Sequence, residues 1–539
     1  MKNFEKIGLM LDCSRNAVPT VKTLKKLINI LAKMGYNRLE LYTEDTYEIK
    51  SRPYFGYLRG RYSGAELNEI DSYAVEKGIE LTPCIQVLAH TKQIFRWPVF
   101  DNVRDLEDIL LVDAPETYAL IEDMFKSLAE NFTSRNVNIG CDEAHMVGLG
   151  EFLDRFGFQD RVEIINRHIG KVLEIAKKHG FSCAMWSDMY FRLISGGRYE
   201  AFNSDTSVSP ELLARVPKDV SLIYWEYCYR DAEHYKKMFV SHKLFGNNIE
   251  LAGGAWKWTG FAPDNTYSIK ALEKVLAAAK EYGIKTAMVT AWGDSGAEAS
   301  VFSILPSLFY FARVCQGQSV EPSDLEAGFK EMFGTGFAEF MDIDIINRPP
   351  WHNANKASNT DKHLFYNDCF LGILDGRITG KEAAHYRAVS EKLKMGAYGE
   401  FSYIFKTIRA LADVLELKAD IGVRTRETYR KGDKEGLKVL AEEYGVIIKR
   451  IAAFRKLFEV QWFNENKPFG FEVQDMRLGG LLQRVKTCRR RLLGFCAGRI
   501  TKISELEEDI LPFGRVSGDG QLCILNSHPH IISVCVADF

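Results

Sequence analysis

The chain has 539 residues, of which 46% are hydrophobic and 26% are charged, and its formal net charge is −2. These values are ordinary for folded globular proteins, and they exclude global disorder, collagen-like repeats and a charge-driven tail. The near-neutral balance provides no strong field that would attract nucleic acid or an anionic membrane, so we expect neither as a partner. At roughly 150 residues per domain, the length allows one large domain and at least one more.

The cysteines and the N-terminal segment bear on the cellular location. The chain contains 11 cysteines, an odd number, and no CxxC pair, so we expect neither a disulfide framework nor a metal knuckle. The first residues, MKNFEKIGLMLD, leave no room for the apolar core of a signal peptide, and no stretch of about 18 apolar residues indicates a membrane span. We therefore expect a cytoplasmic location, and we predict no metal and no cofactor.

Short β-rich runs alternate with helix-period segments through the first 300 residues. The runs are residues 6–12, 37–43, 79–90, 137–144, 182–189, 220–227, 248–256 and 285–294. Amphipathic helices such as 21–34 and 162–178 lie between them, and Gly35 and Gly180 follow these two as C-terminal caps do. Eight such alternations predict a closed (β/α)8 TIM barrel over residues 1–320. An open doubly wound sheet is the alternative, but no glycine-rich phosphate loop follows the first run.

The chain changes character after about residue 320, where the strand signals stop and residues 381–500 follow the period of long helices. One apolar stripe consists of Leu437, Leu440, Tyr444, Ile447, Ile451, Phe454 and Phe458. We therefore predict a mainly α-helical C-terminal domain over residues 321–510 and an irregular tail over 511–539. A basic run from Arg484 to Arg491 is expected to be a solvated helix face, because no aromatic residues alternate with it.

The active site of a (β/α)8 barrel is built at the C-terminal ends of its strands. In this chain those positions carry Asp12, Arg15, Glu44, Asp45, Gln86, His90, Asp142, Glu143, His145, Trp186, Asp188, Trp225, Glu226, Tyr227, Trp256, Trp258, Trp292 and Asp294. Five of the chain's 8 tryptophans lie there, and an aromatic face suits the C–H face of a hexopyranose ring. A single tryptophan is often a core residue, but this group, mixed with carboxylates, favours a sugar-binding pocket.

The sharpest local signal is the run NIGCDE, residues 138–143. Strand alternation places Asn138, Gly140 and Asp142 on the barrel interior, with Glu143 just beyond, at the rim. Two neighbouring carboxylates in an aromatic pocket should have divergent pKa values, one ionised and the other protonated as an acid. This is glycosidase chemistry. The alternative is a structural role, in which the carboxylates cap the loop or pair with Arg15.

The run NIGCDEA resembles the signature of glycoside hydrolase family 20, the β-N-acetylhexosaminidases, in which His or Asn, any residue, Gly, any residue and Asp-Glu end the fourth barrel strand. The similarity extends over about residues 5–310, through LDCSRNAVP, YTEDTYE, QVLAH, DEAHMVGLG and AWGDSGAE. The helical region resembles that of a bacterial subgroup of exo-hexosaminidases. The resemblance implies an exo-acting retaining enzyme that removes terminal β-linked N-acetylglucosamine from small oligosaccharides, with N-acetylgalactosamine left open.

The resemblance also implies substrate-assisted catalysis, in which the substrate's 2-acetamido oxygen attacks the anomeric carbon and gives an oxazolinium intermediate. In this scheme Asp142 accepts the acetamido N–H, Tyr227 donates to the acetamido oxygen, and Glu143 is the acid and then the base. The implied substrate-binding residues are Arg15, His90, Trp186, Trp225, Trp256, Trp292 and Asp294. Alternation lets only one of Glu226 and Tyr227 face the pocket, and we expect Tyr227 because it shares the parity of Trp225.

Three other interpretations stay open. A conventional retaining β-glycosidase would use Asp142 or Glu226 as its nucleophile, and it would not require a 2-acetamido group. A metal-dependent barrel hydrolase would use His90, Asp142, His145 and Asp188, and chelators would inhibit it. A non-catalytic sugar-binding barrel would bind glycans without turnover. The sequence also leaves the oligomeric state open, a homodimer being one option.

Overall fold

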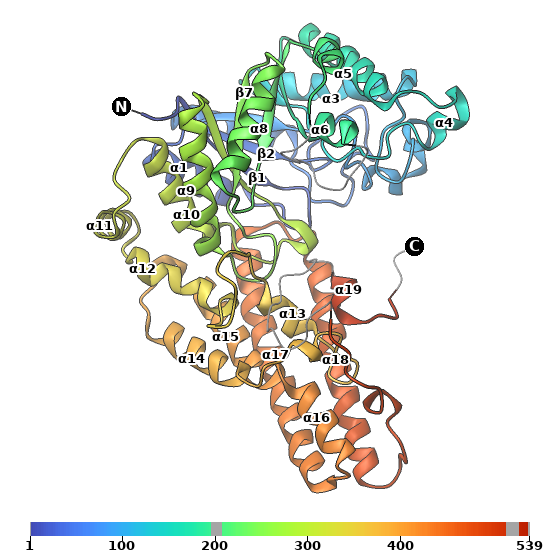
Figure 1. Ribbon diagram of the computed structural model, residues 1–539, viewed down its shortest axis with the longest axis vertical. Helices are drawn as coiled ribbons and strands as arrows, with labels where there is room; N and C mark the ends of the chain where they lie inside the picture. The colour runs from blue at the N-terminus through green and yellow to red at the C-terminus, as the bar shows by residue number, and fades with distance from the viewer. Residues whose placement is uncertain (1, 196–206, 514–527, 537–539) are drawn as a thin grey trace. The chain divides into compact units, whose positions relative to one another are not determined.

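A computed structural model describes residues 2–195, 207–513 and 528–536. Its eight strands form a closed parallel barrel in the order β1 to β8, so the TIM-barrel prediction is confirmed (Figure 1). The strands are β1 (Lys6–Asp12), β2 (Arg38–Tyr42), β3 (Glu80–Cys84), β4 (Asn136–Asn138), β5 (Ser182–Trp186), β6 (Val220–Trp225), β7 (Ile249–Gly254) and β8 (Thr286–Ala291). They are almost entirely buried, as expected of a parallel sheet whose outer face is covered by helices.

The helices of the first 320 residues follow the predicted alternation. They are α1 (Val21–Met34), α2 (Gly64–Glu76), α3 (Pro115–Asn131), α4 (Glu151–Phe156), α5 (Arg161–Lys178), α6 (Asp188–Ile194), α7 (Pro210–Arg215), α8 (Ala232–Leu244), α9 (Asn265–Glu281) and α10 (Leu305–Cys315). Local chemistry sets the ends of α1, because the Thr20 side chain accepts from the Thr23 N–H at the start and Gly35 has a φ of +85° at the end. The predicted helix 21–34 is therefore confirmed residue for residue.

The chain divides into two compact units. The first comprises residues 1–255, 268–291 and 308–320, and the second comprises residues 256–267, 292–307 and 321–539. One segment of the first unit ends at residue 320, and the predicted domain bounds stay a prediction. The segments that follow β7 and β8, however, group with the C-terminal helices rather than with the barrel. Among the described residues, no helix is long and apolar enough to span a membrane.

The second unit is helical, as predicted. Its helices are α11 (Pro322–Phe333), α12 (Phe337–Phe340), α13 (Thr360–Tyr366), α14 (Glu382–Met395), α15 (Ser402–Lys418), α16 (Ile421–Arg430), α17 (Lys434–Glu465), α18 (Phe471–Cys496) and α19 (His528–Ile532). The two longest, α17 and α18, run side by side (Figure 1). All seven residues of the predicted apolar stripe are buried on α17. Residues 514–527 and 537–539 of the predicted tail lie outside the described residues, and the rest of it includes α19.

The basic run on α18 is a solvated face only in part: Lys486 and Arg490 are exposed as expected, whereas the other three arginines form contacts within the chain. Arg484 forms an ion pair with Asp368, with Nε to Oδ2 at 2.6 Å. The Nε of Arg489 donates to the carbonyl oxygen of Ala441 at 2.8 Å, and Arg491 pairs with Glu505. These arginines therefore join α18 to other parts of the helical unit, because guanidinium groups bind carboxylates and carbonyls in a fixed geometry.

The barrel interior contains a buried ionic cluster. Arg38 on β2 contacts Glu40 on the same strand, with Nη2 to Oε1 at 2.7 Å, and Glu250 on β7, with Nη1 to Oε2 at 2.9 Å. Strands β2 and β7 are not neighbours, so these side chains meet across the interior. Burial raises the pKa of Glu40, and the charge of Arg38 opposes that shift.

Candidate active site

The loop after β4 leaves strand geometry earlier than the sequence pattern predicts. Strand β4 has only 3 residues, and Gly140, Cys141 and Glu143 have φ values of +73°, +70° and +54°. Left-handed backbone is rare outside glycine and often occurs where function needs it. The alternation that we used to place Asp142 on the interior therefore does not continue to that residue. Its position follows instead from this tight turn.

Gly140 is required by close packing in this loop. A Cβ there would overlap the Gln86 side chain and the carbonyl oxygen of Ile85, and its positive φ is a second reason for glycine. The Gln86 side-chain oxygen accepts from the Cys141 N–H at 3.1 Å, and the Asn138 side chain accepts from the Gly140 N–H at 3.0 Å. Side chains from β4 and from the segment after β3 thus hold the backbone that carries the carboxylate pair.

Asp142 is held as a buried, ionised carboxylate. The amide nitrogen of Gln86 donates to its Oδ1 at 2.6 Å, and Nε2 of His90 lies 3.2 Å from its Oδ2. Burial alone would raise the pKa of Asp142, but the charge of His90 and the hydrogen bonds from His90 and Gln86 lower it below its usual value. Burial alone would lower the pKa of His90, but the charge of Asp142 raises this pKa to about 9.

Glu143 has a more open environment than its neighbour. Its side chain is 39% exposed, against 11% for Asp142. Nη2 of Arg192 donates to its Oε1 at 3.2 Å, and Nε2 of His90 lies 3.7 Å from its Oε2. Asp188 holds both partners of this contact, since its Oδ2 accepts from the Glu143 N–H and from Nε of Arg192, each at 3.0 Å. Burial and the nearby Asp142 charge raise the pKa of Asp188 to about 7.

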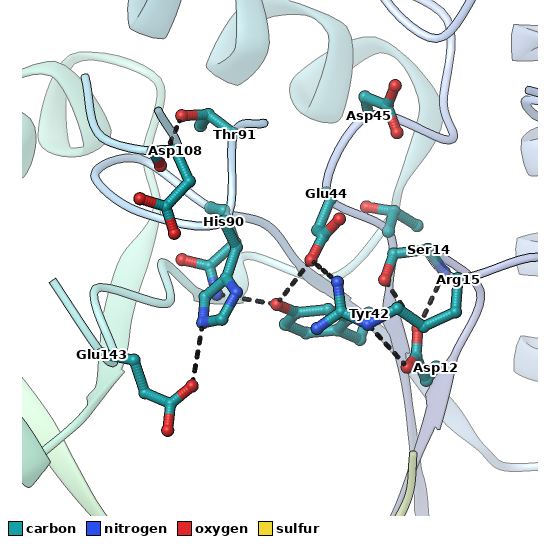
Figure 2. Close-up of polar contacts among 12 residues, drawn as sticks. Asp12, Ser14, Arg15, Tyr42, Glu44, Asp45, His90, Thr91, Asp108 and Glu143 are labelled. Carbon is teal, nitrogen blue, oxygen red and sulfur yellow. Dashed lines mark hydrogen bonds and ion pairs between the residues drawn. The ribbon is translucent and has the colours of Figure 1, made fainter. Parts of the chain in front are cut away.

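A second polar cluster lies at the ends of β1 and β2. Nη1 of Arg15 donates to Oε1 of Glu44 at 2.6 Å, and the Tyr42 hydroxyl donates to the same oxygen at 3.1 Å. Nε of Arg15 also lies 3.9 Å from a carboxylate oxygen of Asp12. The Gln86 amide donates to the Tyr42 hydroxyl at 2.9 Å, which links this cluster to Asp142. Figure 2 shows His90 between Glu143 on one side and Tyr42, Glu44 and Arg15 on the other.

The aromatic residues of β5 and β6 also end at this face of the barrel. Trp186 is the last residue of β5 and is buried. Trp225 ends β6, and its ring stacks on Tyr227 with centroids 5.1 Å apart and planes at 21°. Glu226, between them, accepts from the Cys228 N–H at 2.9 Å, and its Oε2 lies 3.1 Å from Nε2 of His234 on α8. The two aromatic side chains therefore lie together, and Glu226 is engaged by the start of α8.

Three of the predicted substrate-binding residues belong to the second compact unit, namely Trp256, Trp292 and Asp294. There, Trp256 stacks on Trp258 with centroids 4.4 Å apart, and its ring meets Tyr267 edge-on at 5.2 Å. Trp292 is buried, and Asp294 begins a short 3-10 turn that includes Gly296.

The structure adds two residues that the sequence analysis did not single out. Tyr42 joins Glu44 to Gln86, and it could have been found from its parity with Arg38 and Glu40, the charged positions of β2. Arg192 lies four residues after Asp188, a spacing at which acidic and basic residues meet on a helix. Among the residues described, no group of three or more His, Cys, Asp or Glu side chains is arranged to hold a metal ion.

We expect the His90 imidazole to titrate near pH 9, because the Asp142 carboxylate lies 3.2 Å from its Nε2. Its pKa is above the ordinary 6.5, so the pair stabilises the fold fully below about pH 6.5 and loses that contribution as pH rises through about 9. NMR of the ring protons measures the midpoint. In Asp142→Asn the midpoint should fall below 6.5, because burial then dominates. A wild-type midpoint at or below 6.5 would contradict the assignment.

Two family models match the chain. The Glycosyl hydrolase family 20 catalytic domain matches residues 4–242, and the Glycoside Hydrolase 20C C-terminal domain matches residues 338–524. The Beta-hexosaminidase of Akkermansia muciniphila is 24% identical over 263 residues, covering 42% of this chain and 53% of the relative. The Hexosaminidase D of Homo sapiens is 27% identical over 156 residues, covering 27% of this chain and 31% of the relative. The chain thus spans about half the length of the first relative and a third of the second.

A solved structure also aligns with the chain. It is the GH20 exo β-N-acetylglucosaminidase from Vibrio harveyi in complex with N-acetylglucosamine, with a TM-score of 0.48 and 17% identity over 64% of this chain and 59% of that chain. The catalytic-domain match contains β1 to β6 and the Asp142–Glu143 pair, and the second match lies within the helical unit. The chain therefore belongs to glycoside hydrolase family 20.

Proposed function

We propose that this protein is an exo-acting, retaining β-N-acetylhexosaminidase that removes terminal β-linked N-acetylglucosamine from small oligosaccharides. The observation that carries the proposal is the unequal setting of two consecutive carboxyl groups. Asp142 is buried against His90 and Gln86, whereas Glu143 is 39% exposed beside Arg192. Different environments let one carboxylate stay ionised while the other exchanges a proton with the substrate. Membership of the family and relatives named hexosaminidases support the same activity.

The proposed reaction uses the substrate's own acetamido group. Its carbonyl oxygen bonds to the anomeric carbon while the glycosidic C–O bond breaks, and Glu143 gives its proton to the leaving oxygen. The ionised Asp142 accepts the acetamido N–H and stabilises the positive charge of the oxazolinium, and Tyr227 donates to the acetamido oxygen. Glu143 then takes a proton from water, whose oxygen attacks the anomeric carbon while the bond from that carbon to the acetamido oxygen breaks, so two inversions give net retention.

The cluster at the ends of β1 and β2 supports binding of the ring hydroxyls. Arg15 and Glu44 are paired at 2.6 Å, and together they offer donors and acceptors on one side of the site. The conventional mechanism with Glu226 as nucleophile has less support, because His234 and Arg230 already contact its carboxylate. The cytoplasmic location and the homodimer stay predictions.

The test compares release of nitrophenol from the β-linked N-acetylglucosaminide and from the matched β-glucoside. We expect turnover of the acetamido sugar alone, because the glucoside lacks the group that attacks the anomeric carbon. The β-linked N-acetylgalactosaminide is a third arm and measures tolerance of the inverted fourth hydroxyl. Comparable turnover of the glucoside would reject substrate assistance and support an enzyme nucleophile. Binding of the sugar without turnover of any substrate would support a non-catalytic barrel.

A further inference from the structure

An exposed aromatic cluster on the barrel unit is not used by the proposed reaction. Tyr54, Tyr57 and Trp97 contact one another, with ring centroids 5.9 Å apart for the two tyrosines and 5.5 and 5.2 Å from each to Trp97. Tyr54 is 46% exposed and Tyr57 is 45% exposed. Leu58 and Val99 beside them are also exposed. Trp97 is half-buried beside the two exposed tyrosines. Aromatic rings that gather at the surface rather than in a core are typical of a binding surface.

The loop that carries the two tyrosines is anchored beside the candidate active site. Gly56, which precedes Tyr57, packs so closely on Asp45 that a Cβ would overlap the carbonyl oxygen of that residue. Two residues further along, Nε of Arg59 donates to Oδ1 of Asp45 at 3.2 Å, and its guanidinium also donates to the carbonyl oxygen of Ser14. Asp45 directly follows Glu44, so the loop that carries both tyrosines is anchored beside the Arg15–Glu44 pair.

Trp97 comes from the neighbouring strand's loop. That loop follows β3, carries His90, whose Nε2 contacts Asp142, and reaches Trp97 through a 3-10 turn over Ile94–Arg96. The loops after β2 and β3 leave from the same end of the barrel, which is the end that carries active sites in this fold. The cluster is therefore part of the rim that surrounds the carboxylate pair.

We propose that Tyr54, Tyr57 and Trp97 bind sugar units beyond the one that is cleaved, so that the preferred substrate is an elongated β-linked glycan. The rings offer apolar faces for the C–H surface of a pyranose, and the tyrosine hydroxyls and indole N–H can bond sugar hydroxyls. Gln93 and Arg96, paired at 2.9 Å and exposed, add polar groups in the same loop. This inference rests on the proposed function, because it extends the substrate of that same site.

The experiment measures kcat/KM for the nitrophenyl N-acetylglucosaminide and for the β1,4-linked dimer, trimer and tetramer of N-acetylglucosamine. Each of Trp97→Ala and Tyr57→Ala should lower the ratio of tetramer to nitrophenyl kcat/KM roughly 3- to 10-fold, the size expected of one aromatic contact. Tyr57→Phe should keep most of the ratio, because it retains the ring. Val99→Ala, in the same loop and 59% exposed, is the matched control and should leave the ratio unchanged.

Direct binding separates failure of this inference from failure of the proposed function. Calorimetry with the tetramer and the Glu143→Gln variant should show weaker binding when Trp97→Ala is added. An unchanged ratio with unchanged tetramer binding would overturn the inference, as would an equal fall on all substrates, which indicates a structural role. A change of oligomeric state without a change of the ratio would identify a self-association surface instead. A wild type that hydrolyses nothing would reject the proposed function, and calorimetry would still test the cluster.

Discussion

Glu143→Gln is expected to lower kcat/KM by about two to four orders of magnitude on β-linked N-acetylglucosamine oligosaccharides. The amide cannot give a proton to the leaving sugar oxygen or take one from water. A nitrophenolate leaves without proton transfer, so the loss in the first step should be smaller on the nitrophenyl substrate. Arg192 and His90 lie beside Glu143 in the wild type, at 3.2 and 3.7 Å, and hold its carboxyl group in place.

The measurement for Glu143→Gln is a comparison of steady-state kinetics on the two kinds of leaving group. Glu151→Gln is the matched control, because Glu151 on α4 is 43% exposed and pairs with a surface residue of the same helix, Arg155. Its activity should stay within about twofold of wild type, as is usual for a surface substitution. Equal losses on both leaving groups, or a loss below tenfold, would contradict the acid–base assignment.

Asp142→Asn is expected to cost a similar two to four orders of magnitude in kcat/KM, for a different reason. An asparagine keeps the shape of the side chain, but it carries no charge to stabilise the oxazolinium. It also removes the partner that holds the pKa of His90 near 9. The pH profile of the residual activity should therefore change, whereas that of Glu151→Gln should not.

Thermal unfolding by circular dichroism accompanies the kinetics of Asp142→Asn. The variant should fold, because Gln86 can rotate its amide to donate or accept, although the loss of the ion pair with His90 lowers the midpoint. Activity within tenfold of wild type in the folded variant would contradict the role of Asp142.

The sequence patterns predict elements best where the physics is local. Helix α1 begins and ends where the Thr20 cap and Gly35 place it. Strand β1 coincides with the predicted run 6–12, and β6 begins at Val220 as predicted but ends at Trp225, two residues before the end of the predicted run. The grouping of polar residues at the strand ends follows from topology, since parallel strands of a closed barrel end together. The family signature around Asp142 adds the chemistry to that position.

Other features depend on contacts between distant residues. The turn at Gly140 to Glu143 has positive φ angles because Gln86, on another strand's loop, packs against it, and no pattern within residues 138–143 encodes that contact. The assignment of residues 256–267 and 292–307 to the helical unit likewise depends on packing with residues far along the chain, such as Asp361, which accepts from the Phe261 N–H at 2.9 Å.

The buried cluster of Arg38, Glu40 and Glu250 has a consequence for how the barrel closes. Side chains alternate along a strand, so a slip of β2 by one residue would turn Arg38 and Glu40 outward, into the apolar layer beneath the helices. Glu250 would then remain in the barrel interior without its ion-pair partner. Each misplaced charge would carry a large desolvation penalty. Hydrophobic residues alone would tolerate such slips more readily. These three charges therefore disfavour misaligned strand pairings, and so help to specify one stagger of the strands, the shear, for the closed barrel.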